Sequence, residues 1–329
     1  MTKEKQAKSV VGVDIGGTKI MTALFSTDGR ILDRDVRSTL TGEGVDAVIG
    51  RLLSAIDSIL NGSRMGSSQL GAIVIACAGG IDTGRGVVVT PSPNMPGWTD
   101  IPLADIVQKK FGTNTFLVND ASAAALGEHR YGAGMGVNNL VLITLGTGIG
   151  GGIITDGRLY LGAVGGAGEI GHMSIDVNGP KCGCGNTGCL EMLASGTAVA
   201  GDAVRRIHQG EKSSLSEMVS GKIESITAEM VGRAARNGDK LSRDVVARAA
   251  FYLGIGMVNV VNIFNPEMIV IGGGMAELGD MIIEPGRRMV AERAFSISSR
   301  VVRIVTAQLG NEAGVYGAAA YALDVRRAK

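Results

Sequence analysis

The stretch that decides the fold is VVGVDIGGTKIMTALF, residues 10–25. Its two apolar runs, residues 10–15 and 20–25, predict strands, and the glycines and threonine between them predict a tight loop. A turn at Thr27-Asp28-Gly29 leads to a third predicted strand, residues 31–38. The fold is therefore expected to begin as strand, glycine loop, strand, turn, strand.

The same order recurs in the second half of the chain. Residues 140–145 predict a strand, 146–152 a glycine turn, and 153–155 and 158–161 two further strands. This weak internal repeat predicts two similar domains that face each other. No linker-like segment interrupts the chain, so the domains are expected to pack together, with their boundary near residues 119–121.

The rest of the chain alternates helices and strands, as an α/β protein does. Helices are predicted at 44–61, 103–111, 121–127, 191–209, 227–237, 241–264, 279–293 and 313–326. Further strands are predicted at 72–78, 115–118, 268–271 and 301–306. Four prolines make residues 90–102 a rigid loop.

Composition excludes several classes of protein. Of 329 residues, 45% are hydrophobic, which excludes a disordered chain, and the length suggests about two domains. The net charge is +1, and the sequence lacks the cluster of basic residues that is typical of a nucleic-acid binder. No apolar run approaches the ~18–20 residues of a membrane helix, and the run before Gly12 is too short for a signal peptide. A soluble, cytoplasmic protein is expected.

Glycine is the first unusual feature, with 51 residues that fall in clusters. Gly146-Thr-Gly-Ile-Gly-Gly fits the dinucleotide pattern G-x-G-x-x-G, but a Rossmann loop opens a helix and this one opens a strand. A glycine hairpin instead presents backbone N–H groups to an anion. Residues 14–19 have the same shape, with Asp14 as an acid for Mg²⁺ and Thr18 as a hydroxyl donor. Two facing loops could grip the phosphates of one nucleotide, and two ordinary hairpins are the alternative.

Two further sites each have two interpretations. Glycines 272–274 follow an apolar strand, and they form either a shelf for a flat adenine or a plain helix-entry turn. Asn119-Asp120 ends another apolar strand and precedes a predicted helix. Asp120 is either the N-cap of that helix or a carboxylate facing the crevice where α/β proteins bind ligands.

Cysteine is the second unusual feature, because three of the four lie within residues 182–189 as C-x-C-x₄-C. With His172 they would form the closed tetrahedral shell of a structural Zn²⁺, and a disulfide is the alternative. Cys77 lies in an apolar strand and is expected in the core. Glu169 and Glu191 flank the cluster, either as surface acids or as carboxylates held to accept hydroxyl hydrogen bonds.

Together these motifs closely resemble the ROK family (repressor, open reading frame, kinase), most of all its bacterial glucokinases. The resemblance covers nearly the whole chain. It rests on Asp14-Ile-Gly-Gly-Thr-Lys19, Val118-Asn-Asp120, Leu145-Gly-Thr-Gly-Ile-Gly-Gly-Gly152, Glu169-Ile-Gly-His172 and Cys182-Gly-Cys-Gly-Asn-Thr-Gly-Cys-Leu-Glu191.

The resemblance implies an α/β, actin-like ATPase fold of two ribonuclease-H-like domains around a central cleft. The smaller domain would hold residues 1–119 and about 311–329, and the larger, with the zinc insert, residues 120–310. It implies a cytoplasmic ATP-dependent glucokinase that uses ATP, Mg²⁺ and structural Zn²⁺, as a homodimer or homotetramer. Nucleotide and phosphate contacts would come from Asp14, Gly16, Gly17, Thr18, Lys19, Gly146, Thr147, Gly148, Gly150, Gly272, Gly273 and Gly274.

For the hexose, the resemblance implies contacts from Asn94, Asn119, Asp120, Glu169, His172 and Glu191. Asp120 would be the general base for the 6-hydroxyl. His172 would serve both sites, with one ring nitrogen on zinc and the other on sugar, and Cys182, Cys184 and Cys189 would complete the metal shell. The segment Pro93-Asn94-Met95-Pro96-Gly97-Trp98 is similar to the substrate loop of glucokinases.

Two rival functions and one open choice remain at this point. The family also contains repressors with a DNA-reading segment before the first loop, and thirteen residues precede Asp14 here, which favours the enzyme. A metal-stabilised scaffold without catalysis is the second rival. Kinases for N-acetylmannosamine, N-acetylglucosamine, fructose or allose share these motifs, so the sequence leaves the hexose open, and also whether polyphosphate replaces ATP.

Overall fold

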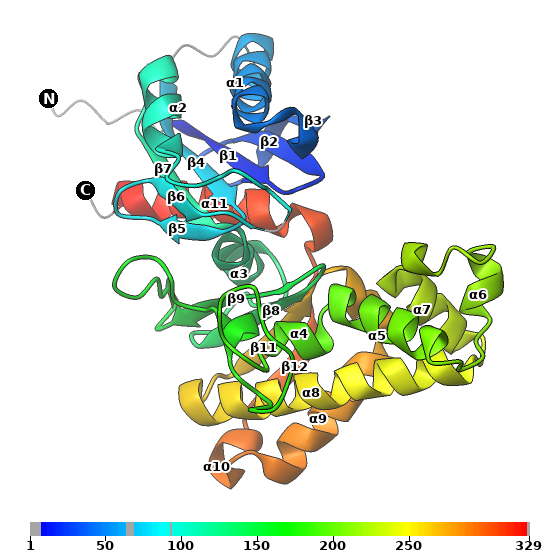
Figure 1. The fold of residues 1–329 in the computed structure, drawn as a ribbon. Helices are drawn as coiled ribbons and strands as arrows, with labels where there is room; N and C mark the ends of the chain where they lie inside the picture. The colour runs from blue at the N-terminus through cyan, green and yellow to red at the C-terminus, as the bar shows by residue number, and fades with distance from the viewer. Residues whose placement is uncertain (1–7, 64–68, 93, 328–329) are drawn as a thin grey trace, which may run out of the picture. The chain divides into compact units, whose positions relative to one another are not determined.

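A computed structural model describes residues 8–63, 69–92 and 94–327, and the chain divides into two compact units (Figure 1). Unit 1 contains Met1–Gly136, Gly152–Gly168 and Gln308–Lys329. Unit 2 contains Val137–Gly151 and Glu169–Ala307. Pro93 of the predicted substrate loop lies outside the described residues.

Unit 1 is built on a five-stranded sheet with the order β3-β2-β1-β4-β7. Its strands are β1 (Ser9–Ile15), β2 (Lys19–Phe25), β3 (Ile31–Ser38), β4 (Leu70–Cys77) and β7 (Thr115–Asn119). β1, β2 and β3 are antiparallel neighbours, whereas β4 runs parallel to β1 and to β7. A short hairpin, β5 (Gly80–Asp82) and β6 (Val87–Thr90), follows β4. The sequence did not predict this hairpin.

Helices cover both faces of this sheet (Figure 1). On one face, α1 (Val45–Gly62) and α2 (Leu103–Phe111) bury residues such as Leu52, Ile56 and Val107 against the strands. On the other face lies α11 (Ala313–Arg327), which packs along α3 (Asp120–Tyr131) and buries Val315, Ala318 and Ala322. Small residues on α3 and α11 allow the close approach of the two helices. Gly317, for example, has no room for a Cβ beside Ala123.

The strand register brings the predicted acids of unit 1 to one edge of the sheet. Ile15 pairs with Cys77, and Cys77 pairs with Asn119, so the carboxyl ends of β1, β4 and β7 lie side by side. Asp14 is the last residue but one of β1, and Asp120 follows β7 directly. Cys77 itself is fully buried, as expected for a core residue.

The second sheet repeats the strand order of the first: β10-β9-β8-β11-β12. Its strands are β8 (Leu140–Leu145), β9 (Ile149–Thr155), β10 (Arg158–Leu159), β11 (Met268–Gly272) and β12 (Arg303–Thr306). β11 is parallel to both β8 and β12. The internal repeat that the sequence predicts is therefore a repeat of topology.

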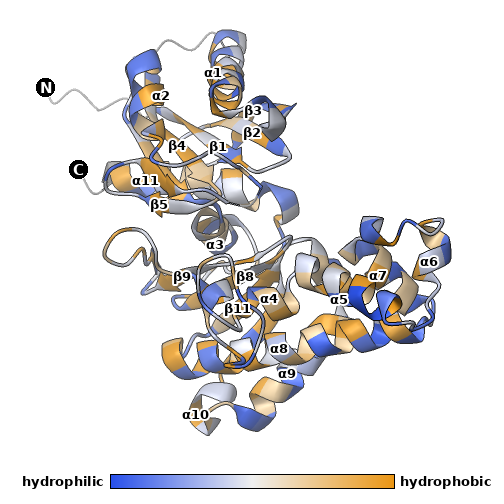
Figure 2. Cartoon of the chain, viewed as in Figure 1, coloured by the Kyte–Doolittle hydropathy of each residue, from blue (hydrophilic) through white to orange (hydrophobic). Residues whose placement is uncertain are grey.

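Unit 2 is rich in helices. They are α4 (Glu191–Ala194), α5 (Gly196–His208), α6 (Leu215–Met218), α7 (Ala228–Arg236), α8 (Lys240–Phe264), α9 (Asp280–Arg293) and α10 (Ser296–Ser299). α8 is long and apolar enough by composition to cross a membrane, but 56% of its apolar window is buried. It packs against α9, α7 and α5 and carries hydrophilic as well as hydrophobic residues, as a core helix does (Figure 2).

Two predictions of local structure need correction. The second glycine turn covers residues 146–148 and not 146–152, because β9 already begins at Ile149. Gly152 belongs to that strand, where a Cβ would lie 2.5 Å from the Cβ of Ala125 on α3. The helix predicted at 191–209 is divided at Ser195, whose side chain accepts a hydrogen bond from the Ala198 N–H and starts a new helix. The sequence also missed α6 and α10.

The compact units divide the chain at other places than residue 119. Residues 120–136 belong to unit 1, because α3 packs along α11. Glu128 of α3 is fully buried. Its carboxylate accepts hydrogen bonds from the backbone N–H groups of Ala133, Gln308 and Leu309 at 2.7–3.1 Å. These bonds hold the start of the C-terminal segment to α3.

Candidate active site

The first glycine loop, Gly16-Gly17-Thr18, joins β1 to β2, and the carbonyl groups of its first and last residues accept hydrogen bonds. The fully buried Thr39 donates from its hydroxyl to Gly16 O at 2.7 Å and from its N–H to Thr18 O at 2.9 Å. Within the described part of the chain, the N–H groups of Gly17 and Thr18 have no acceptor. The loop therefore presents donors, which is the property of an anion-binding nest.

The second loop, Gly146-Thr147-Gly148, joins β8 to β9 and has the same arrangement. Gly146 O accepts from the N–H of Gly196 at 2.8 Å, and Thr147 O accepts from the hydroxyl of Thr197 at 2.8 Å. Among the residues that the structure describes, nothing accepts from the N–H groups of Thr147 and Gly148. A threonine that is distant in the chain thus donates to each loop: Thr39 to Gly16 O and Thr18 O, and Thr197 of α5 to Thr147 O.

None of the four glycines in these loops has a positive φ, so backbone conformation does not require glycine there, and packing requires it at only two of the positions. A Cβ on Gly17 would lie 2.5 Å from the Cβ of Asn94, and one on Gly148 would overlap the carboxylate of Glu191. Gly16 and Gly146 have no neighbour within 3.5 Å of a Cβ. Neither φ nor packing requires glycine at these two positions. The open space beside them would suit a bound phosphate.

The other glycines predicted to contact the nucleotide differ in how well their surroundings suit that role. The N–H of Gly150 donates to the hydroxyl of Thr144 at 3.2 Å, so this donor is already used. Gly273 has a structural reason of its own, a φ of 84° and contact with the backbone of Leu145. Gly274, in contrast, faces open space and begins a 3-10 helix, Gly274–Leu278, that precedes α9.

Asp120 is not the cap of its helix, because Asn119 has that role. Oδ1 of Asn119 accepts from the N–H groups of Ala121 at 3.0 Å and Ser122 at 3.1 Å, and its Nδ2 donates to Gly79 O at 3.2 Å. Asp120 is the first helical residue, and its Oδ1 also accepts from the Ala121 N–H at 2.8 Å. The N-cap interpretation of Asp120 is therefore wrong, and no hydrogen bond from the described residues reaches its second carboxylate oxygen.

The electrostatics of this edge are unusual, because two carboxylates lie close together there. Burial, and then the charge of Asp120, raise the pKa of Asp14 to about 7, while Lys19 lowers it. Burial also raises the pKa of Asp120, and the hydrogen bond from Ala121 partly opposes this effect. Asp14 lies against the first turn of α11, where a Cβ on Gly314 would come within 2.6 Å of its Oδ2. A divalent cation would relieve the repulsion between these acids.

Asn94 and Lys19 border the first loop. Asn94 is exposed, but Met95 and Trp98 beside it are almost fully buried and anchor the segment in the core of unit 1. Asn94 contacts Gly17, as described above, so the predicted sugar segment touches the predicted phosphate loop. Nζ of Lys19 lies 3.4 Å from the backbone oxygen of Asn311.

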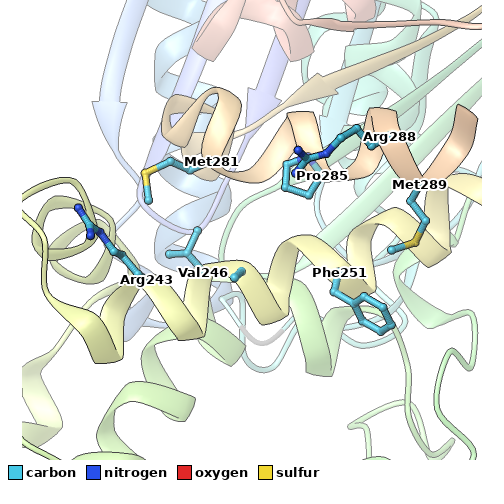
Figure 3. Close-up of a pocket in the computed structure, with 8 residues that line it drawn as sticks. Arg243, Val246, Phe251, Met281, Pro285, Arg288 and Met289 are labelled. Carbon is cyan, nitrogen blue, oxygen red and sulfur yellow. The ribbon is translucent and has the colours of Figure 1, made fainter. Parts of the chain in front are cut away.

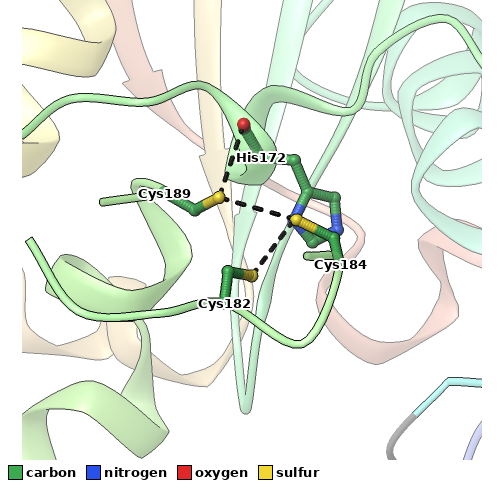
Figure 4. Close-up of side chains that lie close together, drawn as sticks. All are labelled: His172, Cys182, Cys184 and Cys189. Carbon is green, nitrogen blue, oxygen red and sulfur yellow. Dashed lines mark hydrogen bonds between the residues drawn. The ribbon is translucent and has the colours of Figure 1, made fainter. Parts of the chain in front are cut away.

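In unit 2, His172, Cys182, Cys184 and Cys189 come together as the sequence predicts (Figure 4). Their potential ligand atoms all lie within 4.8 Å of one another. Sγ of Cys182 is 3.7 Å from Nδ1 of His172, and Sγ of Cys184 is 3.7 Å from Sγ of Cys189. All four cysteines of the chain are free thiols, so the disulfide alternative is wrong.

These distances fit zinc. With Zn–S bonds of about 2.3 Å, two ligand atoms of a regular tetrahedron are about 3.8 Å apart. The two separations of 3.7 Å are close to this value, and three thiolates with one imidazole leave no open position for water. The donor set is therefore that of a closed, structural zinc site.

The second ring nitrogen of His172 points to Glu169. Nε2 lies 3.9 Å from Oε2 of Glu169, too far for a direct hydrogen bond and suitable for one group that bridges both. Both side chains are partly exposed, at 36% and 50%. Nδ1 of His172 thus faces the thiols, and Nε2 faces a carboxylate. The predicted double role of His172, with one nitrogen on zinc and the other on sugar, requires this arrangement.

The structure thus gathers the predicted residues in two groups. In unit 1 the acids Asp14 and Asp120 share the sheet edge with the first loop, and in unit 2 Glu191 touches the second loop. Sequence reasoning missed Thr39 and Thr197, which bind the loop carbonyls. A separate groove of about 380 Å³ between α8 and α9, lined by Arg243, Phe251, Met281, Arg288 and others, contains none of the predicted residues in its lining (Figure 3).

Comparison with known proteins places these features in a family. The ROK family model matches residues 10–325. A glucokinase of Thermotoga maritima is 38% identical over 313 residues, 94% of this chain and 96% of that protein. A crystal structure of a ROK family glucokinase from Streptomyces griseus in complex with glucose and AMPPNP has a TM-score of 0.80 and 34% identity, and the match covers 98% of this chain and 100% of that one.

A xylose repressor of Caldicellulosiruptor bescii is also similar, with 31% identity over 97% of this chain and 79% of the repressor. The family match and the structural similarity confirm the predicted actin-like ATPase fold. The chain belongs to the ROK family.

Proposed function

We propose that the chain is an ATP-dependent glucokinase that transfers the γ-phosphoryl group of ATP to the 6-hydroxyl of glucose. The observation that carries the proposal is the state of Asp120. Asn119 caps the helix in its place, and burial raises the pKa of the Asp120 carboxyl above its ordinary value. A carboxylate with a free oxygen and a raised pKa is a good general base.

The residues divide the work of phosphoryl transfer, which needs positioning and charge neutralisation more than covalent chemistry. Asp120 would accept the proton of the 6-hydroxyl as that oxygen attacks phosphorus. The free N–H groups of Gly17, Thr18, Thr147 and Gly148 would bind phosphate oxygens, with Lys19 nearby. The adenosine would lie near Gly272–Gly274, where Gly274 leaves open space.

Sugar hydroxyls would be bound by Asn94, Asn119, Asp120, Glu169, His172 and Glu191. For Asn119 the contact would come from its remaining N–H, since the rest of its amide is engaged. Asp14 fits a Mg²⁺ ion, which would neutralise phosphate charge when bound. Zn²⁺ held by His172 and the three cysteines would fix the ring whose other nitrogen meets the sugar.

The test is a panel of hexoses at fixed Mg-ATP, with sugar phosphate measured as product. Glucose should give the highest kcat/KM. Binding should also change the fluorescence of Trp98, the single tryptophan, which is buried and lies four residues after Asn94 in the chain. A preference for N-acetylmannosamine, N-acetylglucosamine, fructose or allose would change the substrate and keep the mechanism. Sugar binding without any turnover would favour a sugar-responsive regulator, which the similar xylose repressor makes the second candidate.

A further inference from the structure

Glu191 holds the second glycine loop directly. Its Oε2 accepts a hydrogen bond from the backbone N–H of Ile149 at 2.8 Å, and Ile149 is the first residue after the turn. The carboxylate occupies the space that a side chain on Gly148 would need. The loop and this carboxylate are therefore fitted to each other.

The backbone of Glu191 is fixed from the other side by the cysteine cluster. Cys189 and Leu190, which precede it, are fully buried. The N–H of Leu190 donates to Met173 O at 2.9 Å, next to His172 in the chain. Glu191 then begins α4. Its carboxylate is consequently held by a rigid segment and does not belong to a free surface loop.

One oxygen of this carboxylate remains available. Within the described part of the chain, Oε1 of Glu191 accepts no hydrogen bond, and the side chain is partly exposed. A hydroxyl donor at Oε1 would restrict rotation of the carboxylate and hold Oε2 against Ile149. A ligand at one oxygen would thus order the loop that the other oxygen binds.

We propose that Glu191 is a positioning residue for the phosphate loop and couples sugar binding to nucleotide binding. The inference rests on the proposed function, in which Glu191 meets a sugar hydroxyl. Because coupling free energy is reciprocal, sugar should raise nucleotide affinity by the same factor by which nucleotide raises sugar affinity. A residue that only binds sugar would leave nucleotide affinity in the absence of sugar unchanged.

The first test measures the Kd of Mg-AMPPNP by calorimetry without any sugar. Glu191→Ala should weaken binding by at least about fivefold, whereas Glu191→Gln, whose carbonyl oxygen can still accept from Ile149, should stay within about twofold. Met192→Ala is the matched control on the same short helix and should bind as the wild type does. The inference is overturned if Glu191→Ala, with its zinc retained, binds Mg-AMPPNP as tightly as the wild type.

A second test perturbs the contact from the loop and does not depend on the folding of Glu191 variants. Gly148→Ala puts a Cβ on the Glu191 carboxylate, whereas the nearest atom to a Cβ at Gly146 is 4.0 Å away. The Kd of glucose, measured without nucleotide, should rise about fivefold in Gly148→Ala and stay unchanged in Gly146→Ala. Equal glucose affinities would overturn the inference. A wild type that binds neither glucose nor AMPPNP would overturn the proposed function itself.

Discussion

Replacing Asp14 by Asn should stabilise the protein at neutral pH, although it removes a proposed Mg²⁺ ligand. Burial, with a smaller contribution from Asp120, raises the pKa of Asp14 from 3.8 to about 7, against the opposing effect of Lys19. The folded protein therefore binds this proton more tightly than the unfolded chain does. The ionised carboxylate weakens folding, and the loss of stability grows as the pH rises from 3.8 to about 7.

The size of the effect follows from the shift. About three pKa units at 1.36 kcal/mol each give an upper bound of about 4 kcal/mol. Because Asp14 is partly exposed, solvent screening reduces this to about 2 kcal/mol. More than half of it should appear between pH 5 and pH 8, so Asp14→Asn should gain about 1 kcal/mol on the wild type over that interval.

Urea unfolding at pH 5 and pH 8, without nucleotide or added Mg²⁺, measures this gain. Asp105→Asn, which changes an exposed aspartate in the first turn of α2, is the control and should cost a few tenths of a kcal/mol at both pH values. If Asp14→Asn is less stable than the wild type at pH 8, or if its advantage is the same at both pH values, the electrostatic account of this edge is refuted.

Two further predictions concern the metal and the cap. The native protein should contain one tightly bound zinc per chain. Cys184→Ala should lose both the metal and the affinity for glucose, because the free energy of metal binding contributes to the folding of such loops. Elemental analysis that finds no zinc in the native protein would contradict this. Asn119→Ala removes the cap of α3 and should lower the free energy of unfolding by about 1 kcal/mol in urea, whereas an unchanged value would mean that Asp120 can replace it.

Much of the fold could be predicted because its signals are local. Apolar runs bounded by glycine gave the strands close to their observed limits, and the repeated order of elements anticipated the repeated sheet. The zinc cluster was also accessible from sequence, since its three cysteines lie within residues 182–189 and His172 is near in the chain.

The remaining features depend on tertiary contacts that no local pattern contains. Thr39 and Thr197 bind loop carbonyls that lie 23 and 50 residues away in the chain, and threonine is too common to stand out. Asn119 and Asp120 are adjacent and both cap helices well, so only the geometry decides between them. The end of the second glycine turn was misplaced because Gly152 is needed for packing against α3, which the sequence does not reveal.

The central claim is that Asp120 is the general base, and the kcat of Asp120→Asn tests it most directly. Since Asn119 caps the helix, the substitution should not lower the stability, and glucose should still bind within about tenfold. Loss of the proton acceptor should reduce kcat at least about 100-fold. A variant that retains more than about a tenth of the wild-type kcat would contradict the account, because proton transfer to Asp120 would then contribute little.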